Sequence, residues 1–328
     1  MMVLLLLALQ EPPQIRDPKP LTSGGTHAEA YFNHDGTKLV LMGHRPGDAA
    51  DQIYVLELAG GRLERVSSGE GKTTCGYFLP DGRLVYSSTH HHGAAPPPRP
   101  DRSQGYVWPF FRTFDLFLRE KDGTLKRLTD SDGYDAETTV SPDGKTLVFT
   151  SQRDGEMALY TLGVDGSNLR RVTKRRGYPG GAFFSPDGTK LVYRAFYPKT
   201  PEEEAALERL LAERLLEPRK CHFEIFVCNP DGSGEKALTS FGKASWAPCY
   251  HPDGKTIVFA SDKDATRPGQ FSLYAMDADG KNVRRLTAHD GFDSFPHFSP
   301  DGTKIVFISN RGGADPRRDL NVFLADWR

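Results

Sequence analysis

The chain has 328 residues, a formal net charge of −1, 26% charged residues and 38% hydrophobic residues. This near-neutral charge argues against nucleic-acid binding, which usually accompanies a strong basic excess, and the hydrophobic content is too high for a disordered chain. Four cysteines are too few for a disulfide-stapled scaffold. The composition therefore predicts a soluble globular protein with a sizeable hydrophobic core.

The N-terminus begins with a short apolar run, residues 3–9, which ends at Gln10-Glu11-Pro12-Pro13. The run is too short for a membrane-spanning helix, which needs about 20 apolar residues, but it is similar to the apolar part of a secretory signal. We therefore expect residues 1–12 to be a signal peptide and the protein to be periplasmic or otherwise exported. A disordered apolar start is the alternative, and no other segment is predicted to cross a membrane.

An Asp-Gly turn between an aromatic-rich strand and a strand rich in Leu, Ile and Val recurs six times along the chain. The turn aspartates are Asp35, Asp81, Asp143, Asp187, Asp253 and Asp301. Their spacings of 46, 62, 44, 66 and 48 residues indicate a unit of about 45 residues with two insertions. Because Asp can hydrogen-bond to its own backbone and Gly accepts a positive φ, each turn predicts a β-hairpin.

Each unit predicts four antiparallel strands: an inner strand, the Asp-Gly turn, a second strand, a third strand, another turn and a fourth strand. Four strands in about 45 residues are typical of a β-propeller blade. The last unit lacks a fourth strand, and residues 20–25 match residues 285–290, so the N-terminal strand is expected to complete the sixth blade. The predicted fold is all-β, a six-bladed propeller over residues 13–328 with insertions at about 90–112 and 199–219 and one short helix.

Repeated Ser-Pro-Asp-Gly turns and Arg-Leu-Thr outer strands, over about residues 20–328, resemble the TolB-like, WD-repeat-like six-bladed β-propeller family. This resemblance implies the fold and a bacterial protein that is exported. We expect no room for the α/β domain that precedes the propeller in the family's Tol-Pal member, so the resemblance implies a single-domain member and leaves a Tol-Pal role open. Other members gate peptidases, but here no hydrolase domain and no Gly-x-Ser-x-Gly motif is found.

The insertion in the second unit contains three adjacent histidines, His90 to His92, followed by prolines and by the aromatic residues Tyr106 and Trp108. In an extended segment, His90 and His92 face one way and His91 the other, so a metal ion could take at most two of them. A solvated loop is therefore favoured over a metal site. The aromatic residues of this insertion either seal the channel mouth or stack on a sugar or a peptide, and Tyr106 and Trp108 are the candidate ligand-binding residues.

The insertion in the fourth unit is predicted to be a helix between Thr200 and Pro218. Thr200 and Glu203 form a capping box, and leucines from 207 to 216 form one apolar stripe. Docking of this stripe on its own domain is favoured over a partner-binding surface. Both insertions lie between second and third strands, so they share the face opposite the Asp-Gly turns, which is the face expected to carry function.

The starts of the inner strands carry the best chemical candidates, at positions six and eight residues before the turn Asp. The candidate ligand-binding residues there are His27, Glu29, Asp135, Glu137 and Asp293, with His297 deeper in the channel. Their oxygen and imidazole groups suit Ca²⁺, Mn²⁺ or Zn²⁺, and the predicted metal set is His27, Glu29, Asp135 and Glu137. The favoured alternative is structural, because four cations, Arg45, Arg153, Lys263 and Arg311, could pair with rim carboxylates such as Glu29 and Glu137.

Three functions remain open. The preferred one is an exported, rigid binding or scaffolding module that holds a protein, peptide or glycan of the cell envelope on the insert-bearing face. The second is a metal-assisted saccharide lyase or hydrolase at the channel mouth, since the family resemblance includes oligosaccharide lyases with a channel metal. The third is a gate or partner of a separate peptidase. The absence of a nucleophile triad in the sequence leans away from catalysis.

Overall fold

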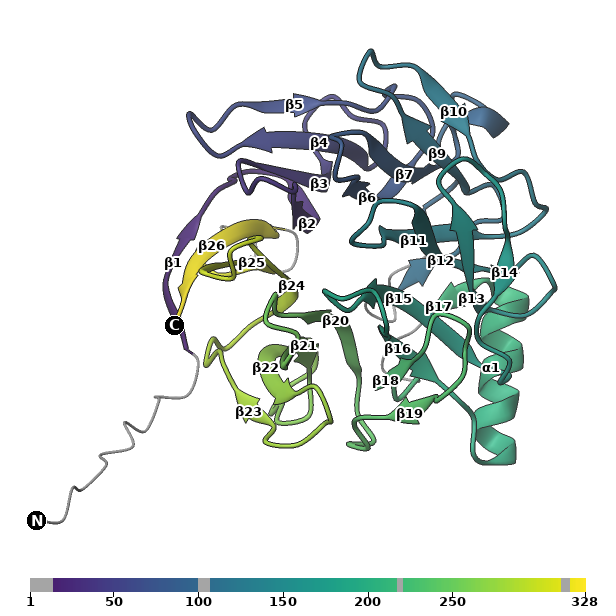
Figure 1. Cartoon of the computed structure of the whole chain (residues 1–328), viewed down its shortest axis with the longest axis vertical. Coiled ribbons are helices and arrows are strands. Elements are labelled where there is room, and N and C mark those ends of the chain that lie inside the picture. Colours follow the sequence, from purple (N-terminus) through teal and green to yellow (C-terminus); the bar gives the residue numbers. More distant parts are fainter. Residues whose placement is uncertain (1–13, 100–106, 217–220, 314–318) are drawn as a thin grey trace, which may run out of the picture.

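The computed structural model describes residues 14–99, 107–216, 221–313 and 319–328, and it consists mainly of six four-stranded antiparallel sheets. The sheets follow one another around a central axis as the blades of a propeller, with their first strands innermost (Figure 1). This arrangement confirms the predicted all-β, six-bladed fold.

The strands of the first three blades follow the order of the sequence from the axis outward. Blade one contains β2 (Thr26–Phe32), β3 (Lys38–His44), β4 (Gln52–Glu57) and β5 (Leu63–Arg65). Blade two contains β6 (Thr73–Phe78), β7 (Leu84–Ser88), β9 (Asp115–Arg119) and β10 (Leu125–Arg127). Blade three contains β11 (Asp135–Val140), β12 (Thr146–Ser151), β13 (Ala158–Gly163) and β14 (Arg170–Arg171).

The same order holds in blades four and five, whereas blade six takes its outermost strand from the N-terminus. Blade four contains β15 (Tyr178–Phe184), β16 (Leu191–Phe196), β18 (Glu224–Cys228) and β19 (Lys236–Ala237). Blade five contains β20 (Ser245–Tyr250), β21 (Thr256–Ser261), β22 (Ser272–Asp277) and β23 (Arg284–Arg285). Blade six contains β24 (Asp293–Phe298), β25 (Lys304–Ser309), β26 (Asn321–Trp327) and β1 (Ile15–Pro20).

The ring closes through β1, which pairs antiparallel with β26 from the other end of the chain. Just beyond β1, the Thr22 hydroxyl accepts a hydrogen bond of 3.0 Å from the Val322 backbone N–H. In every blade a Thr or Ser hydroxyl after the fourth strand accepts such a bond from the third strand, and the other five are Ser67, Thr129, Thr173, Thr239 and Thr287. This repeated hydroxyl thus satisfies one third-strand amide per blade, and the pairing of β1 with β26 confirms the predicted closure.

The Asp-Gly turns have the predicted geometry. In all six, the turn Asp accepts a hydrogen bond of 2.8 to 3.1 Å from the backbone N–H two residues later. In blade six, hydrogen bonds from Ser299 and Thr303 lower the pKa of Asp301 to about 2. These aspartates are therefore committed to turn formation.

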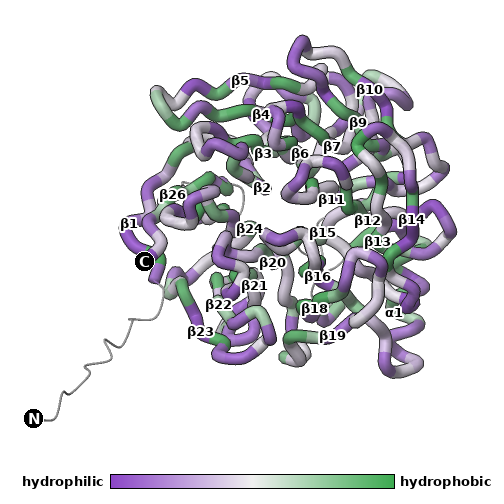
Figure 2. Tube along the Cα trace, viewed as in Figure 1, coloured by the Kyte–Doolittle hydropathy of each residue, from purple (hydrophilic) through white to green (hydrophobic). Residues whose placement is uncertain are grey.

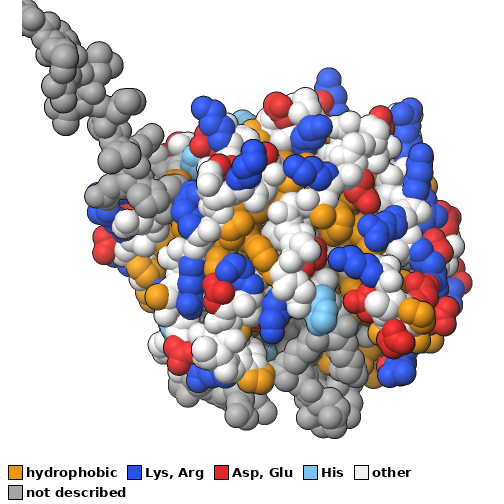
Figure 3. All heavy atoms as spheres, turned by 90° about the horizontal axis from the view of Figure 1, so that it is seen from below, with side chains coloured by type: hydrophobic (Ala, Val, Ile, Leu, Met, Phe, Trp, Pro, Cys, Tyr) orange, Lys and Arg blue, Asp and Glu red, His pale blue; other side chains and the backbone are white. Residues whose placement is uncertain are grey.

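The core lies between neighbouring blades, where the second and third strands are packed on both faces. Val40, Leu147 and Ile257, each in a second strand, are fully buried, and Figure 2 shows the same strands as the most hydrophobic part of the trace. Figure 3 shows Lys and Arg side chains interspersed with Asp and Glu on the side of the ring that lies lowest in Figure 1. Charged outer edges of this kind disfavour pairing with another sheet.

The blade-two insertion joins β7 to β9 and contains the histidine run. Contrary to our expectation, His90–His92 is not extended but forms a 3₁₀ helix, η1, because the chain turns directly after the Ser88 end of β7. The His90 Nδ1 atom lies 2.7 Å from the Ser88 hydroxyl, and the His92 Nε2 atom lies 3.1 Å from the Asp115 carboxylate. The three side chains therefore do not share one ligand-binding face.

The blade-four insertion joins β16 to β18 and contains the helix α1 (Pro201–Glu213). Thr200 caps it as predicted, by accepting the Glu203 backbone N–H. The helix ends earlier than expected, because Arg214 adopts a left-handed conformation and the next two residues form β17 (Leu215–Leu216); Pro218 lies outside the described residues. Leu207 and Leu210 are buried in a cluster with Phe110 and Phe114, so the leucine stripe docks on its own domain. No helix in the described ranges is long and apolar enough to cross a membrane.

Candidate functional site

Every inner strand has a β-bulge six residues before its turn Asp, where the pairing register with the second strand shifts. The six bulge residues, called here the inner ring, are Glu29, Cys75, Glu137, Gly181, Ala247 and Phe295, and each has a positive φ between 50° and 61°. Five of them are not glycine, and left-handed backbone is unfavourable for such residues. Bulges of this kind often redirect side chains at functional sites.

Below the inner ring, four aromatic side chains close the axis of the propeller. They are Tyr31, Tyr77, Phe183 and His297, each four residues before its turn Asp. Tyr31 and Phe183 come from opposite blades, yet their ring centroids are 5.5 Å apart. Because the inner strands run from the insert-bearing face toward the Asp-Gly turns, the inner ring lies between this aromatic cluster and the insert-bearing face.

His297 lies at the centre of the aromatic cluster and is held by two hydrogen bonds. Its Nδ1 accepts from the Phe32 backbone N–H at 3.2 Å, which leaves Nε2 to carry the proton toward the Tyr77 hydroxyl oxygen, also 3.2 Å away. Burial lowers the pKa of His297 to about 3, so the imidazole is neutral. The expectation that His297 lies deeper than the other candidates agrees with this position.

Glu137 forms the most highly connected charged group of the inner ring. Its two carboxylate oxygens accept hydrogen bonds of 2.8 and 3.1 Å from the Arg194 guanidinium, and Oε2 also accepts from the Thr150 hydroxyl and the Gly181 N–H, both at 2.8 Å. Burial would raise the pKa of Glu137, but Arg194 and these hydrogen bonds outweigh burial and lower it. Gly181 has to be small, because a Cβ there would lie 2.7 Å from Arg194 Nη1.

The two insertions meet beside this ion pair. In the blade-two insertion, β8 (Trp108–Pro109) pairs antiparallel with β17 from the blade-four insertion. The Arg194 guanidinium carbon lies 5.3 Å from the centroid of Trp108 and 5.4 Å from those of Tyr178 and Phe223. Such cation–π contacts stabilise a buried guanidinium. Arg194 therefore joins the inner ring to the strand pair that the insertions build.

Glu29 occupies the same repeat position as Glu137 but has no cationic partner among the described residues. Its Oε2 atom is buried and has no hydrogen-bond partner in that part of the chain, and the Cys75 thiol is its neighbour in the inner ring. Burial raises the pKa of Glu29 to about 7, with a further contribution from the charge of Glu137. Near neutral pH this carboxyl group can therefore act as either a donor or an acceptor of a proton.

The predicted structural pairing of rim carboxylates holds for two residues, but its partners were wrongly assigned. Arg153 lies 2.9 Å from Asp135, and Arg311 lies 2.6 Å from Asp293. Each arginine lies two residues beyond the end of a second strand, whose last residue pairs with the first residue of the inner strand. They therefore reach the residue eight positions before the turn Asp and not the inner-ring glutamates at six.

The four residues predicted to bind a metal are not brought together. Asp135 is committed to Arg153 and Glu137 to Arg194, while His27 is buried beside Gly43 between blades one and six. Across the described ranges, no group of three or more His, Cys, Asp or Glu side chains is arranged to hold a metal ion. Tyr106 lies outside the described residues, whereas Trp108 contributes to the site as described above.

Sequence reasoning missed Arg194, although the signal was present. Arg194 is the single charged residue of the second strand 191–196, which otherwise reads Leu-Val-Tyr-Arg-Ala-Phe. A charge in a strand that is buried on both faces needs a partner, and Glu137 in the neighbouring blade provides it. The meeting of β8 with β17 had no comparable signal, because two residues per strand are too few for a pattern.

Comparison with known proteins places the repeats in a family. Residues 114–203 and 217–316, together more than half of the chain, match the family described as TolB beta propeller domain. The Tol-Pal system protein TolB of Bordetella pertussis is 41% identical over 44 residues, which is 13% of this chain and 10% of that protein. The match thus spans only about one tenth of the length of the curated TolB relative.

Solved structures share the fold over nearly the whole chain. A protein assigned as TolB from Agrobacterium tumefaciens has a TM-score of 0.61 and 20% identity, covering 96% of this chain and 98% of its own. An oligogalacturonate lyase from Vibrio parahaemolyticus has a TM-score of 0.53 and 15% identity, covering 96% of both chains. At these identities the similarity shows the fold alone, and the fold hosts both kinds of protein.

Proposed function

We propose, given that the chain belongs to the TolB β-propeller family, that it is an exported binding module whose insert-bearing face holds a protein, peptide or glycan of the cell envelope. The observation that carries this proposal is the pairing of β8 with β17, which fixes loops from two non-neighbouring blades against Arg194. A surface that is ordered before binding loses little entropy on binding, so such a junction suits recognition.

The inner ring supplies the polar chemistry of the proposed site. Glu29 has one carboxylate oxygen with no partner in the described residues, so it can accept a hydrogen bond from an ammonium or hydroxyl group of a ligand. Glu137 and Arg194 saturate each other and serve as a fixed wall. The site therefore favours a ligand group that donates hydrogen bonds over one that carries negative charge.

Site-specific photo-crosslinking in the native cells tests this proposal. A photoreactive side chain at His91, which is exposed on the insert-bearing face, is compared with one at Lys281, which is exposed on the opposite face. We expect a discrete crosslinked product from position 91 and none from position 281. Efficient turnover of a polymer by the purified chain, or no product from position 91, would contradict the proposal.

Export is tested separately, because residues 1–12 lie outside the described part of the chain. Cell fractionation followed by N-terminal sequencing is expected to find the mature chain outside the cytoplasm with the first apolar run removed. A full-length chain confined to the cytoplasm would contradict export without affecting the binding site.

A saccharide lyase or hydrolase is the second candidate, and the raised pKa of Glu29 favours it. A carboxyl group with a pKa of about 7 is matched to general acid or base work near neutral pH. The test is an assay with acidic oligosaccharides, comparing the wild type with Glu29→Gln. Turnover that the substitution abolishes would replace the binding proposal with an enzymatic one.

A further inference from the structure

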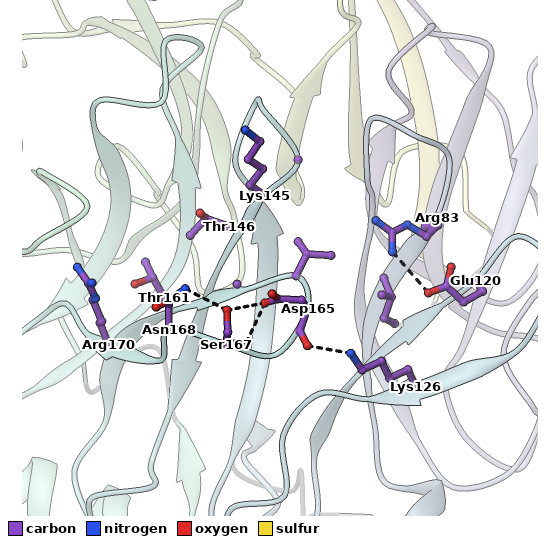
Figure 4. A pocket seen from close by; sticks show the side chains of 14 residues that line it. Arg83, Glu120, Lys126, Lys145, Thr146, Thr161, Asp165, Ser167, Asn168 and Arg170 are labelled. Atoms are coloured by element: carbon purple, nitrogen blue, oxygen red, sulfur yellow. Dashed lines mark hydrogen bonds and ion pairs between the residues drawn. The ribbon is translucent and has the colours of Figure 1, made fainter.

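A groove of about 830 Å³ lies between blades two and three on the face of the Asp-Gly turns, which is opposite the proposed binding face. One wall comes from blade two and includes Arg83, Glu120 and Lys126. The other comes from blade three and includes Lys145 and Arg170, as well as the turn that joins β13 to β14 (Figure 4). No part of the proposed function involves this groove.

The groove carries an excess of positive charge. Arg83 pairs with Asp81 and Glu120, and Lys126 donates to the backbone carbonyl of Asp165. The carboxylate of Asp165 is occupied by the backbone N–H and hydroxyl of Ser167 (Figure 4). Across the described ranges, neither Lys145 nor Arg170 forms an ion pair. These two cations, on one wall of the groove, are therefore available to an anionic ligand.

Blade five has different residues at two positions that line the groove in blade three. Gly163 pairs with Thr146 in blade three, and the equivalent partner of Thr256 in blade five is Asp277. Two residues after the turn Asp, Ser167 in blade three corresponds to Lys281 in blade five, and Lys281 pairs with Asp279. At these two positions blade three thus has a glycine and a serine, whereas blade five has an aspartate and a lysine.

An exposed apolar side chain lies beside the same groove. Leu169 is 44% exposed, and within the described residues it is the only large hydrophobic side chain in that class. Its neighbours Asn168 and Arg170 both line the groove. In blade five the equivalent residue, Val283, packs against the hydrophobic core. Leu169 is not itself a lining residue, but it lies at the edge of the groove between two residues that are, so it offers an apolar contact next to Arg170.

We propose that this groove binds an extended acidic segment of a partner protein, with carboxylates against Lys145 and Arg170 and an apolar side chain against Leu169. A polypeptide fits better than a nucleic acid or another polyanion. The cations are few, two carboxylates line the same groove, and a polyanion makes no use of an exposed leucine. The chain's net charge of −1 also provides no general attraction for polyanions.

Fluorescence anisotropy with a short labelled peptide, in which pairs of Glu alternate with Leu, tests the proposal. We expect the double charge reversal Lys145→Glu with Arg170→Glu to weaken binding about tenfold or more. The matched control is Lys255→Glu with Arg284→Glu at the equivalent positions of blade five, which makes the same charge change and is expected to leave the affinity within about twofold. Equal weakening in both variants would overturn the proposal.

A second variant separates shape from charge. Gly163→Asp together with Ser167→Lys introduces the blade-five residues, leaves the net charge unchanged and narrows the groove. We expect this variant also to lose peptide binding, with thermal unfolding used to verify its fold. Retained binding would overturn the proposal. Competition with heparin, a polyanion without apolar groups, tests whether Leu169 contributes to peptide binding. Equal potency of heparin against the peptide bound to wild type and to the Leu169→Ser variant would also overturn the proposal.

Discussion

Glu29 and Glu137 occupy the same position of the repeat in blades one and three, with the same left-handed backbone, yet the pKa of Glu29 is raised and that of Glu137 lowered. The difference lies in the neighbouring blade. Glu137 faces Arg194, which pairs across the strands with Gly180, whereas the corresponding residue beside Glu29 is Ser87, which pairs with Thr74. The Ser87 hydroxyl is itself buried with no hydrogen-bond partner among the described residues.

This comparison shows how one repeat architecture produces two kinds of site. Around Glu137, a cation and two glycines create a saturated ion pair that joins the insertions to the ring. Around Glu29, Ser87, Thr74 and Cys75 replace them, and the carboxyl group keeps unused hydrogen-bonding capacity. The first region is saturated, whereas the second keeps a buried oxygen atom with no partner in the described residues, so substitutions in the two should behave differently.

Removing the cation beside Glu137 should have the largest effect. Arg194→Met is expected to destabilise the fold by roughly 3–5 kcal/mol, because it leaves a buried carboxylate without its partner. Urea unfolding followed by tryptophan fluorescence measures the change. The double variant with Glu137→Gln should regain most of the loss, and a loss below about 1 kcal/mol for Arg194→Met alone would contradict the structural role of the pair.

Glu29→Gln should have an effect that depends on pH. Because the pKa of Glu29 rises from an ordinary value of 4.5 to about 7 on folding, the folded state binds the proton more tightly than the unfolded state. The wild type should therefore lose stability as pH rises from about 4.5 to about 7, by up to roughly 3 kcal/mol, and then reach a plateau.

The amide that Glu29→Gln introduces cannot titrate, so melting temperatures of this variant and of wild type are compared at a series of pH values. The stability of the variant relative to wild type should increase across this range and flatten above it. Glu137 should behave oppositely, because its pKa is lower in the folded state than in the unfolded state. It stabilises the fold at a pH above its ordinary pKa, and this contribution is lost as the pH falls through the pKa of the folded state. A difference between wild type and variant that is the same at every pH would show that folding does not change the pKa of Glu29.

Gly181→Ala tests the space that the Glu137 region requires. The alanine would adopt a φ of 59°, and its Cβ would lie 2.7 Å from Arg194 Nη1. We expect a loss of about 1–3 kcal/mol in urea unfolding, from backbone strain and displacement of the guanidinium. An unchanged stability would indicate that the ion pair tolerates a shifted arginine. The small residue at position 181 would then not be a requirement of the Glu137 region.

The sequence predicted the parts of the molecule that repeat, together with a single feature that has a local signature, the helix capped by Thr200. Turn aspartates such as Asp301 recur at fixed positions, so one role could be assigned to all six, whereas the hydrogen bond accepted by hydroxyls such as Thr287 was found only in the structure. The pairing of Glu137 with Arg194 occurs in a single blade and joins residues far apart in the chain, so the spacing rule assigned Glu137 to the wrong cation. Glu29 has no partner in the described residues because a serine, Ser87, stands at the position that corresponds to Arg194, and no sequence motif indicates such an absence.

Ala247→Gly is expected to have the smallest effect, and it separates backbone strain from electrostatics. Ala247 has the inner-ring conformation, with a φ of 50°, but carries no charge. Glycine relieves the strain of the left-handed backbone, which stabilises the fold by about 1–2 kcal/mol. It also gives the unfolded chain more freedom, which destabilises the fold by about 0.4–1 kcal/mol. We therefore expect urea unfolding to show a net gain in stability of roughly 0.5–1 kcal/mol. A gain here, with a loss for Gly181→Ala, would mean that every blade bears the same backbone strain and that side chains alone distinguish Glu29 from Glu137. A loss at Ala247 would instead mean that the bulge is supported by packing in blade five, and the two glutamates could then no longer be compared on equal backbones.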